Sequence, residues 1–210
     1  MGKVLGSVGK LSVEHFKTSK RKLYFVPLIF SRKNSGAKLP EDYTKKFIAY
    51  WNEVKNHIDD LQQKMGKVNK IYHELVTLEG EKGVEGLKEI NEKSYQIVKE
   101  LYQKGTKLEL IEDENLLTES EDWLRCLVTY PRTPSVFSKI YDFYLKIMQK
   151  RKKYITQKID KTLLSSQTGI LFIREDINIE LPQDIEIFKI SPPVLDDIHL
   201  ILRESLGSSR

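Results

Sequence analysis

The apolar run Thr168-Gly169-Ile170-Leu171-Phe172-Ile173 constrains the fold of this chain more than any other stretch. A turn precedes it, and the charged residues Arg174-Glu175-Asp176 follow it. A short, unbroken apolar run between turn signals is typical of a strand that is buried on both faces. We therefore expect a central strand here, followed by a turn, a second strand at 185–188 and a terminal helix.

The rest of the chain alternates between short apolar runs and long helical patterns. Further strands are expected at Leu23–Phe30 and Leu108–Ile111, and Pro27 favours an edge position or a bulge for the first of them. Helices are expected at about 40–78, from Leu87 to Lys104, at about 118–130 and at 135–164. Strands separated by helices predict a helix-rich α/β fold with a parallel or mixed sheet covered by helices.

The longest predicted helix, at about 40–78, carries a heptad-like apolar stripe. Its members alternate four and three residues apart: Phe47, Trp51, Val54, Ile58, Leu61, Met65, Val68, Tyr72 and Leu75. This spacing predicts one continuous helix with a single apolar seam. The seam can pack against other helices of the same chain, or it can form a coiled-coil contact with a second copy or another protein.

Length and composition limit the class of protein. A chain of 210 residues with 40% hydrophobic residues can bury a core, and we expect a flexible basic arm at 1–22 and a single α/β domain at 23–210. Its one cysteine, Cys126, cannot form an intramolecular disulfide, which favours a reducing, cytoplasmic setting; we expect this thiol to be buried. No apolar run is long enough to span a bilayer, so no membrane association is expected. No motif indicates a cofactor or a catalytic residue.

Basic residues gather in the N-terminal part and along the helix at 135–164. Five lysines of that helix fall within one narrow sector at 100° per residue. Such a row is either a solvated face or a surface that tracks the phosphates of a nucleic acid. The candidate nucleic-acid-binding residues are Lys20, Arg21, Lys22, Arg32, Lys33, Lys139, Lys146, Lys150, Lys153 and Lys161.

The segment from Glu109 to Asp122 contains acids and no bases. Carboxylate oxygens suit magnesium, and Glu112 and Asp113, at the end of a predicted strand, are the candidate ligands. Carboxylates in the first turn of a helix are also favoured by the helix dipole alone. A metal-dependent enzyme is therefore one of three hypotheses, and the other two involve no catalysis.

The C-terminal quarter of the chain resembles a known family. The residues that carry the likeness are Arg151 to Ile155, Ile159 to Leu163, Thr168 to Ile173 and Leu181 to Ile185. They resemble a prokaryotic family of uncharacterised proteins that is itself similar to eukaryotic-type class I release factors. The resemblance implies a mixed α/β domain and an association with ribosomes or tRNA. The Gly-Gly-Gln tripeptide that carries peptidyl-tRNA hydrolysis in release factors is absent, and Arg174-Glu175-Asp176 replaces an expected turn of glycine and histidine.

Together these features predict a non-catalytic accessory factor that binds RNA or the ribosome through its basic helix face and arm. The alternative is an interaction or scaffold protein that associates with itself or with another protein through the heptad helix. We expect no cofactor for either function.

Overall fold

Five parallel strands form one sheet in the computed structural model, which describes residues 20–31, 41–129 and 131–207. In chain order they are β1 (Arg21–Pro27), β2 (Lys70–His73), β3 (Lys107–Glu109), β4 (Thr168–Ile173) and β5 (Ile185–Lys189). Across the sheet the order is β3-β2-β4-β1-β5. The predicted α/β fold is confirmed, and every strand pair in it is parallel.

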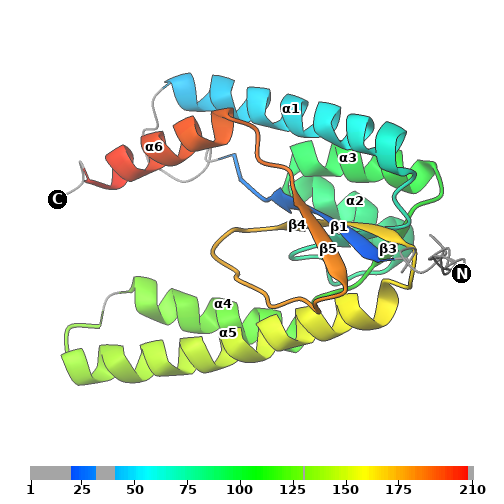
Figure 1. The fold of residues 1–210 in the computed structure, drawn as a ribbon. Coiled ribbons are helices and arrows are strands. Elements are labelled where there is room, and N and C mark those ends of the chain that lie inside the picture. The colour runs from blue at the N-terminus through cyan, green and yellow to red at the C-terminus, as the bar shows by residue number, and fades with distance from the viewer. Residues whose placement is uncertain (1–19, 32–40, 130, 208–210) are drawn as a thin grey trace, which may run out of the picture.

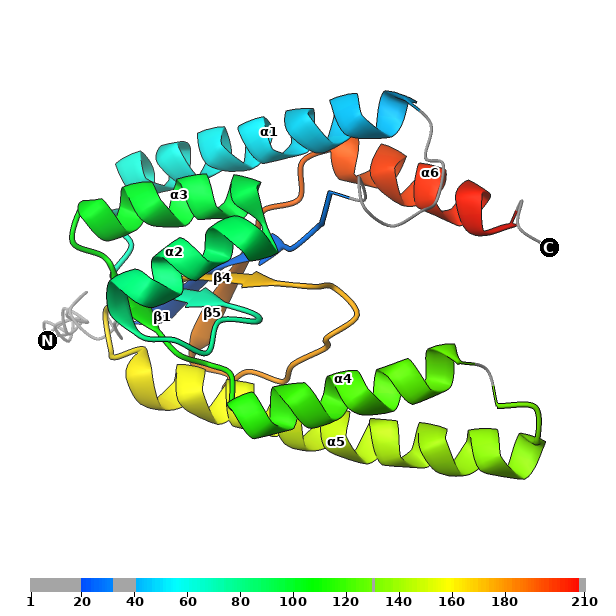
Figure 2. The same cartoon turned by 180° about the vertical axis from the view of Figure 1, so that it is seen from behind.

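Helices cover both faces of this sheet (Figure 1). Those found in the described residues are α1 (Glu41–Met65), α2 (Gly80–Ile90), α3 (Glu92–Gln103), α4 (Glu114–Val128), α5 (Pro134–Thr162) and α6 (Val194–Gly207). Figures 1 and 2 show α1, α2, α3 and α6 on one side of the sheet, and the antiparallel pair α4–α5 on the other.

Alternate residues of the central strand β4 enter two separate apolar cores. Ile170 and Phe172 pack with α1, α2, α3 and α6, whereas Leu171 and Ile173 pack with α5. All four side chains are fully buried. The unbroken apolar run that predicted this strand thus results from the period-2 geometry of a strand between two helical layers.

The predicted helix at 40–78 is wrong in its last third. Helix α1 ends at Met65, and Gly66 follows with a φ of 94°, a left-handed conformation that favours glycine and ends helices. Residues 70–73 instead form β2. Its Ile71 packs in the core that contains α1, and its Tyr72 packs in the core that contains α5. The apolar spacing continued past the end of the helix because a strand buried on both faces also supplies apolar residues there.

The heptad stripe of α1 packs inside the chain. Phe47, Trp51, Val54 and Ile58 are all buried in the core that α1 shares with the sheet and α6. The seam therefore packs against other elements of the same chain, which was one of its two interpretations. These four residues are not available for a coiled-coil contact with a second copy.

Three further expectations are corrected. Strand β1 is internal, with β4 and β5 as neighbours, and Pro27 is tolerated because it is the last residue of the strand. The expected flexible arm at 1–22 lies mostly outside the described residues, but Arg21 and Lys22 belong to β1. Cys126 is exposed, because α4 packs on α5 at one side only and leaves its outer face in solvent.

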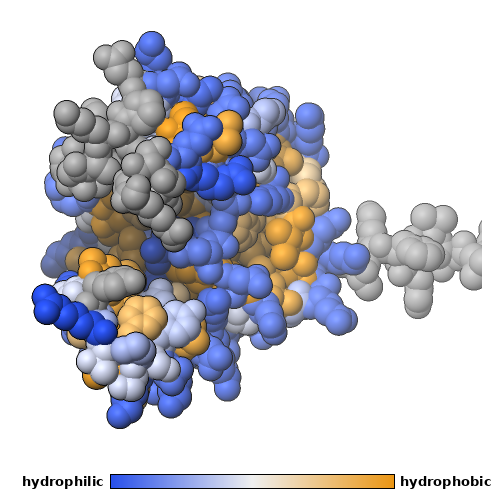
Figure 3. All heavy atoms as spheres, turned by 90° about the vertical axis from the view of Figure 1, so that its left-hand side faces the viewer, coloured by the Kyte–Doolittle hydropathy of each residue, from blue (hydrophilic) through white to orange (hydrophobic). Residues whose placement is uncertain are grey.

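The α4–α5 hairpin extends beyond the sheet on the side where α6 also projects (Figures 1 and 2). Figure 3 looks into this side and shows a hollow between the upper and lower parts of the molecule, with apolar surface inside it. We call this hollow the cleft. Over the described ranges, no helix is both long enough and apolar enough to cross a membrane.

Candidate nucleic-acid interface and the ionic cluster at the sheet edge

The predicted lysine row lies on the exposed face of α5. One side of this helix, formed by Ile147, Arg151, Ile155 and Ile159 at intervals of four, is buried. The lysines of the row are all exposed, at positions 139, 146, 150, 153 and 161. The helix therefore separates an apolar side facing the sheet from a basic side facing solvent.

The lysines of α5 have no acidic partners among the described residues. Helix α5 carries seven lysines in all, because Lys152 and Lys158 lie outside the row, and none of the seven has a described carboxylate within 4.0 Å. Other lysines of the fold are paired, since Lys46 lies 2.8 Å from Asp197 and Lys55 pairs with Asp59 and Glu100. Isolated lysines such as Lys64 also lack a described partner, but they do not form a row on one helix. The positive charge of α5 is thus largely uncompensated within the fold.

Two aromatic rings border the lysine row. The Nζ of Lys146 lies 5.7 Å from the ring centre of Phe143, and that of Lys158 lies 5.2 Å from the ring centre of Tyr154. Phe143 is 47% exposed, although one side of its ring stacks on Trp123 of α4 at 4.8 Å. Tyr154 is half-buried. Accessible rings beside cations are the elements on which the bases of single-stranded nucleic acids stack.

The other predicted basic residues do not extend this row. Lys20 is exposed and Lys22 is half-buried on β1, while Arg32 and Lys33 lie outside the described residues. Arg21 is 9% exposed and its guanidinium is already engaged. It donates to both carboxylate oxygens of Asp184, at 2.7 and 2.9 Å, and to Asp160. The hydrogen bond to Asp184 raises the pKa of Arg21 and lowers that of Asp184. Arg21 therefore fixes β1 to the end of α5. Because its guanidinium is already paired, it is not a surface cation that could contact a phosphate.

The predicted metal ligand Glu112 belongs to a buried ionic cluster at the carboxyl edge of the sheet. Arg151, from the buried row of α5, donates from Nε to Oε2 of Glu112 at 2.8 Å. It also donates from Nη2 to Oε1 of Glu112 and, at 3.2 Å, to Glu74. These three side chains are at most 2% exposed. The cluster joins the ends of β2 and β3 to the helix that covers them.

Arg174, directly after β4, completes the cluster. Its backbone amide and its Nε both donate to Glu74 at 2.8 Å. The two arginines and the two glutamates balance in charge, as a buried ionic group requires. Leu75, next to Glu74, has a φ of 70° and donates its amide to Glu112, so the turn after β2 is held in an uncommon conformation by the same carboxylate.

The pKa values of the cluster follow from burial and pairing. Burial raises the pKa of Glu74 despite the opposing effect of Arg174 and Arg151. For Arg151, burial acts to lower the pKa, but the hydrogen bonds and charges of Glu112 and Glu74 prevail and raise it. The arginine is therefore charged at all ordinary pH values.

His73, at the end of β2, is buried beside this cluster. Its Nδ1 contacts the carbonyl oxygen of Glu74, and its Nε2 lies 3.0 Å from Oγ of Ser94 on α3. Its ring stacks on Phe172 with centres 5.5 Å apart. Burial lowers the pKa of His73 to about 4, so the ring is neutral near pH 7, with Nδ1–H donating to the carbonyl.

The metal hypothesis loses both of its candidate ligands to other partners. Asp113 accepts a hydrogen bond from the amide of Leu116 at 3.0 Å and caps α4. Glu112 accepts hydrogen bonds from the charged guanidinium of Arg151. Within the described part of the chain, no group of three or more His, Cys, Asp or Glu side chains is arranged to hold a metal ion.

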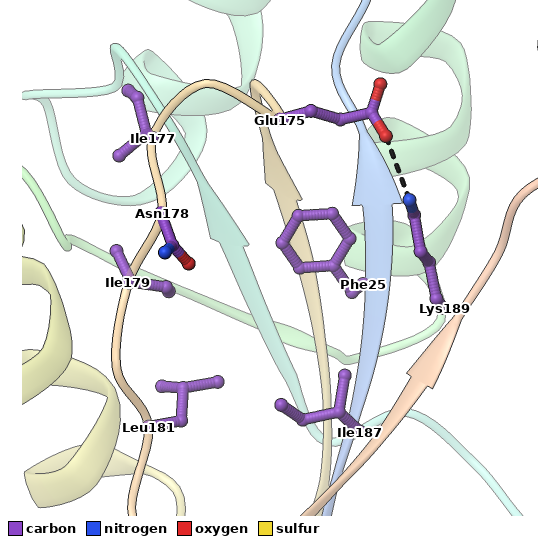
Figure 4. A pocket seen from close by; sticks show the side chains of 8 residues that line it. All are labelled: Phe25, Glu175, Ile177, Asn178, Ile179, Leu181, Ile187 and Lys189. Atoms are coloured by element: carbon purple, nitrogen blue, oxygen red, sulfur yellow. Dashed lines mark hydrogen bonds and ion pairs between the residues drawn. The ribbon is translucent and has the colours of Figure 1, made fainter.

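A shallow apolar pocket of about 300 Å³ lies beside the carboxyl ends of β1 and β5 (Figure 4). The figure shows Phe25 and Ile187 on the strands, with isoleucine and leucine side chains of the β4–β5 connection opposite. At its rim, Glu175 pairs with Lys189 at 2.9 Å and with His199 of α6 at 2.8 Å. Both carboxylate oxygens of Glu175 are thus engaged, one by Lys189 and one by His199.

Sequence reasoning missed the ionic cluster because Arg151 stands inside the run Lys150-Arg151-Lys152-Lys153. The spacing held the missing signal, since Arg151 is four residues from both Ile147 and Ile155. A cation in register with an apolar stripe is a candidate for a buried ion pair, whereas its lysine neighbours fall on the solvent side.

Comparisons with known protein families, with curated proteins and with solved structures gave no match to this chain.

Proposed function

We propose that this protein is a non-catalytic, cytoplasmic RNA-binding factor that holds the phosphate backbone along the lysine face of α5. The observation that carries the proposal is the set of seven lysines on one helix, none of which has a described carboxylate partner. A cation within a salt bridge has already lost part of its attraction for phosphate, whereas an uncompensated row retains all of it.

The aromatic rings favour a single strand over a duplex. Phe143 and Tyr154 are eleven residues apart, or about 16 Å along the helix axis, and each has a lysine Nζ above its ring. Unpaired bases can stack on such rings, while paired bases in a duplex cannot reach them. Because stacking and phosphate contacts carry little base information, we expect weak sequence preference.

The test is the salt dependence of binding to a fluorescent single-stranded RNA. Each neutralised phosphate contributes a slope of about −0.7 to log affinity against log salt. Replacing Lys146, Lys150 and Lys153 by Gln should flatten the slope by about 2 and weaken binding to all sequences alike. Phe143→Ala should weaken binding without changing the slope.

The matched control removes three charges elsewhere. Lys64, Lys82 and Lys88 are exposed and have no described ion-pair partner, so their change to Gln lowers the net charge equally without touching α5. If both triple variants weaken binding to the same extent, net charge alone attracts RNA and the lysine face is not a site. If the parent binds no RNA near physiological salt, the proposed function is wrong.

The resemblance of the C-terminal quarter to a release-factor-like family suggests which natural RNA to test first. Ribosomal RNA should bind the parent more tightly than the α5 triple variant in a sedimentation assay with purified ribosomes. Equal sedimentation of the two proteins would argue against ribosome association through this face.

A further inference from the structure

The sheet surface that β1 and β5 turn toward α5 is incompletely covered. Leu23 of β1 is fully buried in the core that contains Ile155 of α5, and Phe25, two residues on, packs against the same core. Ile187 of β5 aligns with Leu23, so it faces the same side of the sheet. Ile187 is nevertheless 51% exposed, and Phe25 is only half-buried. These two side chains form one wall of the apolar pocket in Figure 4.

The β4–β5 connection forms the opposite wall. Its Ile177 is buried in the core on the α5 side, and Ile179 and Leu181 pack against that core, so the wall is anchored. Figure 4 shows these side chains across the pocket from Phe25 and Ile187. The volume of about 300 Å³ is at the lower end for ligand pockets, which suits one flat ring system better than a whole cofactor.

Asn178 adds a polar group to this apolar frame. It is exposed and lines the pocket, and Figure 4 shows its amide on the pocket side of the connection. Of the residues drawn there, Glu175 and Lys189 pair with each other at 2.9 Å, and none engages the amide of Asn178. The amide therefore offers an acceptor oxygen and an N–H donor, side by side, to a molecule that enters the pocket.

We propose that this pocket binds one adenine base of the single-stranded RNA that α5 holds, an inference that rests on the proposed function. A side-chain amide pairs bidentately with adenine, which presents an amino donor next to a ring-nitrogen acceptor. Guanine presents two acceptors on the same edge and suits an arginine or a lysine instead, but the lysine at this rim, Lys189, is paired with Glu175. The ring of Phe25 supplies a stacking surface, and the aliphatic wall covers the other face of the base.

The pocket and the lysine-bearing helix share a wall. The core that anchors Ile177 and Ile179 also contains Ile155 and packs against Met148 of α5. Lys152, one turn after Met148, is half-buried, so a lysine stands at the margin of the core to which the connection is attached. Helix α5 then supplies affinity without base information, and the pocket adds a single reading position to a strand that is otherwise bound with weak sequence preference.

The first test uses adenosine alone, so that its outcome does not depend on the phosphate contacts of α5. In spectra of the protein with labelled isoleucine methyl groups, adenosine should shift the signals of Ile179 and Ile187, because the base ring lies between them. Ile48, an exposed isoleucine on α1, is the control and should not shift. Uridine should bind more weakly because its smaller ring stacks less. Unmoved pocket signals at about 10 mM adenosine, or equal affinity for the two nucleosides, would overturn the proposal.

Variants identify the group that reads the base. Purine riboside keeps the ring system of adenine and lacks the amino group, so the parent should bind it about two- to tenfold more weakly than adenosine. Asn178→Ala should abolish this difference, whereas Asn56→Ala, at an exposed position of α1, should retain it. Phe25→Leu keeps an apolar side chain and should weaken both nucleosides alike. A difference that persists in Asn178→Ala would show that the amide does not read the base.

The RNA experiment separates this inference from the proposed function. A strand of about 12 uridines with one central adenosine should bind the parent at least about fivefold more tightly than the all-uridine strand. The variant with Lys146, Lys150 and Lys153 changed to Gln should weaken both strands and keep their ratio. Asn178→Ala should remove the ratio and keep the salt slope. Salt-dependent binding without any preference for adenosine would contradict the pocket and leave the lysine face standing. If neither strand binds, the proposed function fails, and the adenosine titration alone decides whether the pocket takes the base.

Discussion

The Nε atom of Arg151 donates to Oε2 of Glu112 at 2.8 Å in a place where both side chains are almost fully buried. One residue comes from the helical layer under the sheet, and the other follows the edge strand β3. The same guanidinium also reaches Glu74 after β2. A single side chain therefore sets the position of α5 against two strand ends.

Removing that side chain should destabilise the fold strongly. Arg151→Met leaves Glu112 buried without a counter-charge, and we expect a loss of about 3–5 kcal/mol in the free energy of unfolding measured with urea. Adding Glu112→Leu should recover part of that loss, because an apolar pair replaces the ionic one. Lys152→Met is the neighbouring control and should change stability by less than about 0.5 kcal/mol. If Arg151→Met behaved like its neighbour, the cluster would not hold the layers together.

His73 should make stability depend on pH in a defined window. Its pKa is lowered to about 4 in the folded protein, against about 6.5 in the unfolded chain. Between these values the unfolded chain binds more protons, so stability falls as pH falls from about 6.5 to 4. The expected loss is about 3 kcal/mol.

The measurement for His73 is the unfolding free energy of the parent and of His73→Gln at both ends of the window. The difference between the two proteins should shrink by about 3 kcal/mol at the acid end, since only the parent has this group to protonate. Carboxylates titrate in both proteins and cancel. A difference independent of pH would mean that the buried ring does not resist protonation.

Gly169 should not tolerate even a methyl group. A Cβ built there would lie 2.9 Å from side-chain atoms of both Leu23 and Tyr72, each fully buried. Gly169→Ala should therefore cost about 1–3 kcal/mol. Gly86→Ala is the matched control, because a Cβ there meets nothing within 4 Å and the helix should gain up to about 1 kcal/mol. Thermal unfolding of both variants would show opposite shifts, and a stabilised Gly169→Ala would contradict the packing of β4.

Phe172 should be among the most costly side chains to truncate. It is fully buried and stacks on both Trp51 and His73, so Phe172→Ala should lose about 3–5 kcal/mol. Ile187 on β5 is 51% exposed, and Ile187→Ala should cost far less. The amides of 170–173 should also exchange among the slowest with solvent. Rapid exchange there would show that β4 is not the centre of the stable core.

Local sequence patterns predicted β4, β5 and α5 well, because the polarity of the residues in these elements follows their burial in the fold. The run from Ile170 to Ile173 is apolar at every position, and Pro134 marks the first residue of α5. The short strand β2 was hidden, because Tyr72 continued the spacing of α1 and only the backbone of Gly66 ends that helix. Periodicity cannot distinguish a four-residue strand with apolar residues in register from one more helical turn.

The site was harder to predict because it joins residues that are distant in sequence. Arg151 meets Glu112 and Glu74 across 39 and 77 residues, and no single stretch shows both charges. The lysine face could be predicted from the sequence, since it lies within one helix. The exposure of Cys126 could not be predicted, because it depends on α4 lying outside the sheet.

The position of β4 governs the order in which this chain can assemble. Among the described strands, β1 pairs with β4 and β5, which both come much later in the chain, since Val26 aligns with Phe172 and Lys22 with Glu186. During synthesis from the N-terminus, β2 and β3 can pair early, but β1 has no neighbour until residue 168 has emerged. Most of the polypeptide must therefore be synthesised before the sheet can close, and we expect slow folding as a consequence of the topology itself.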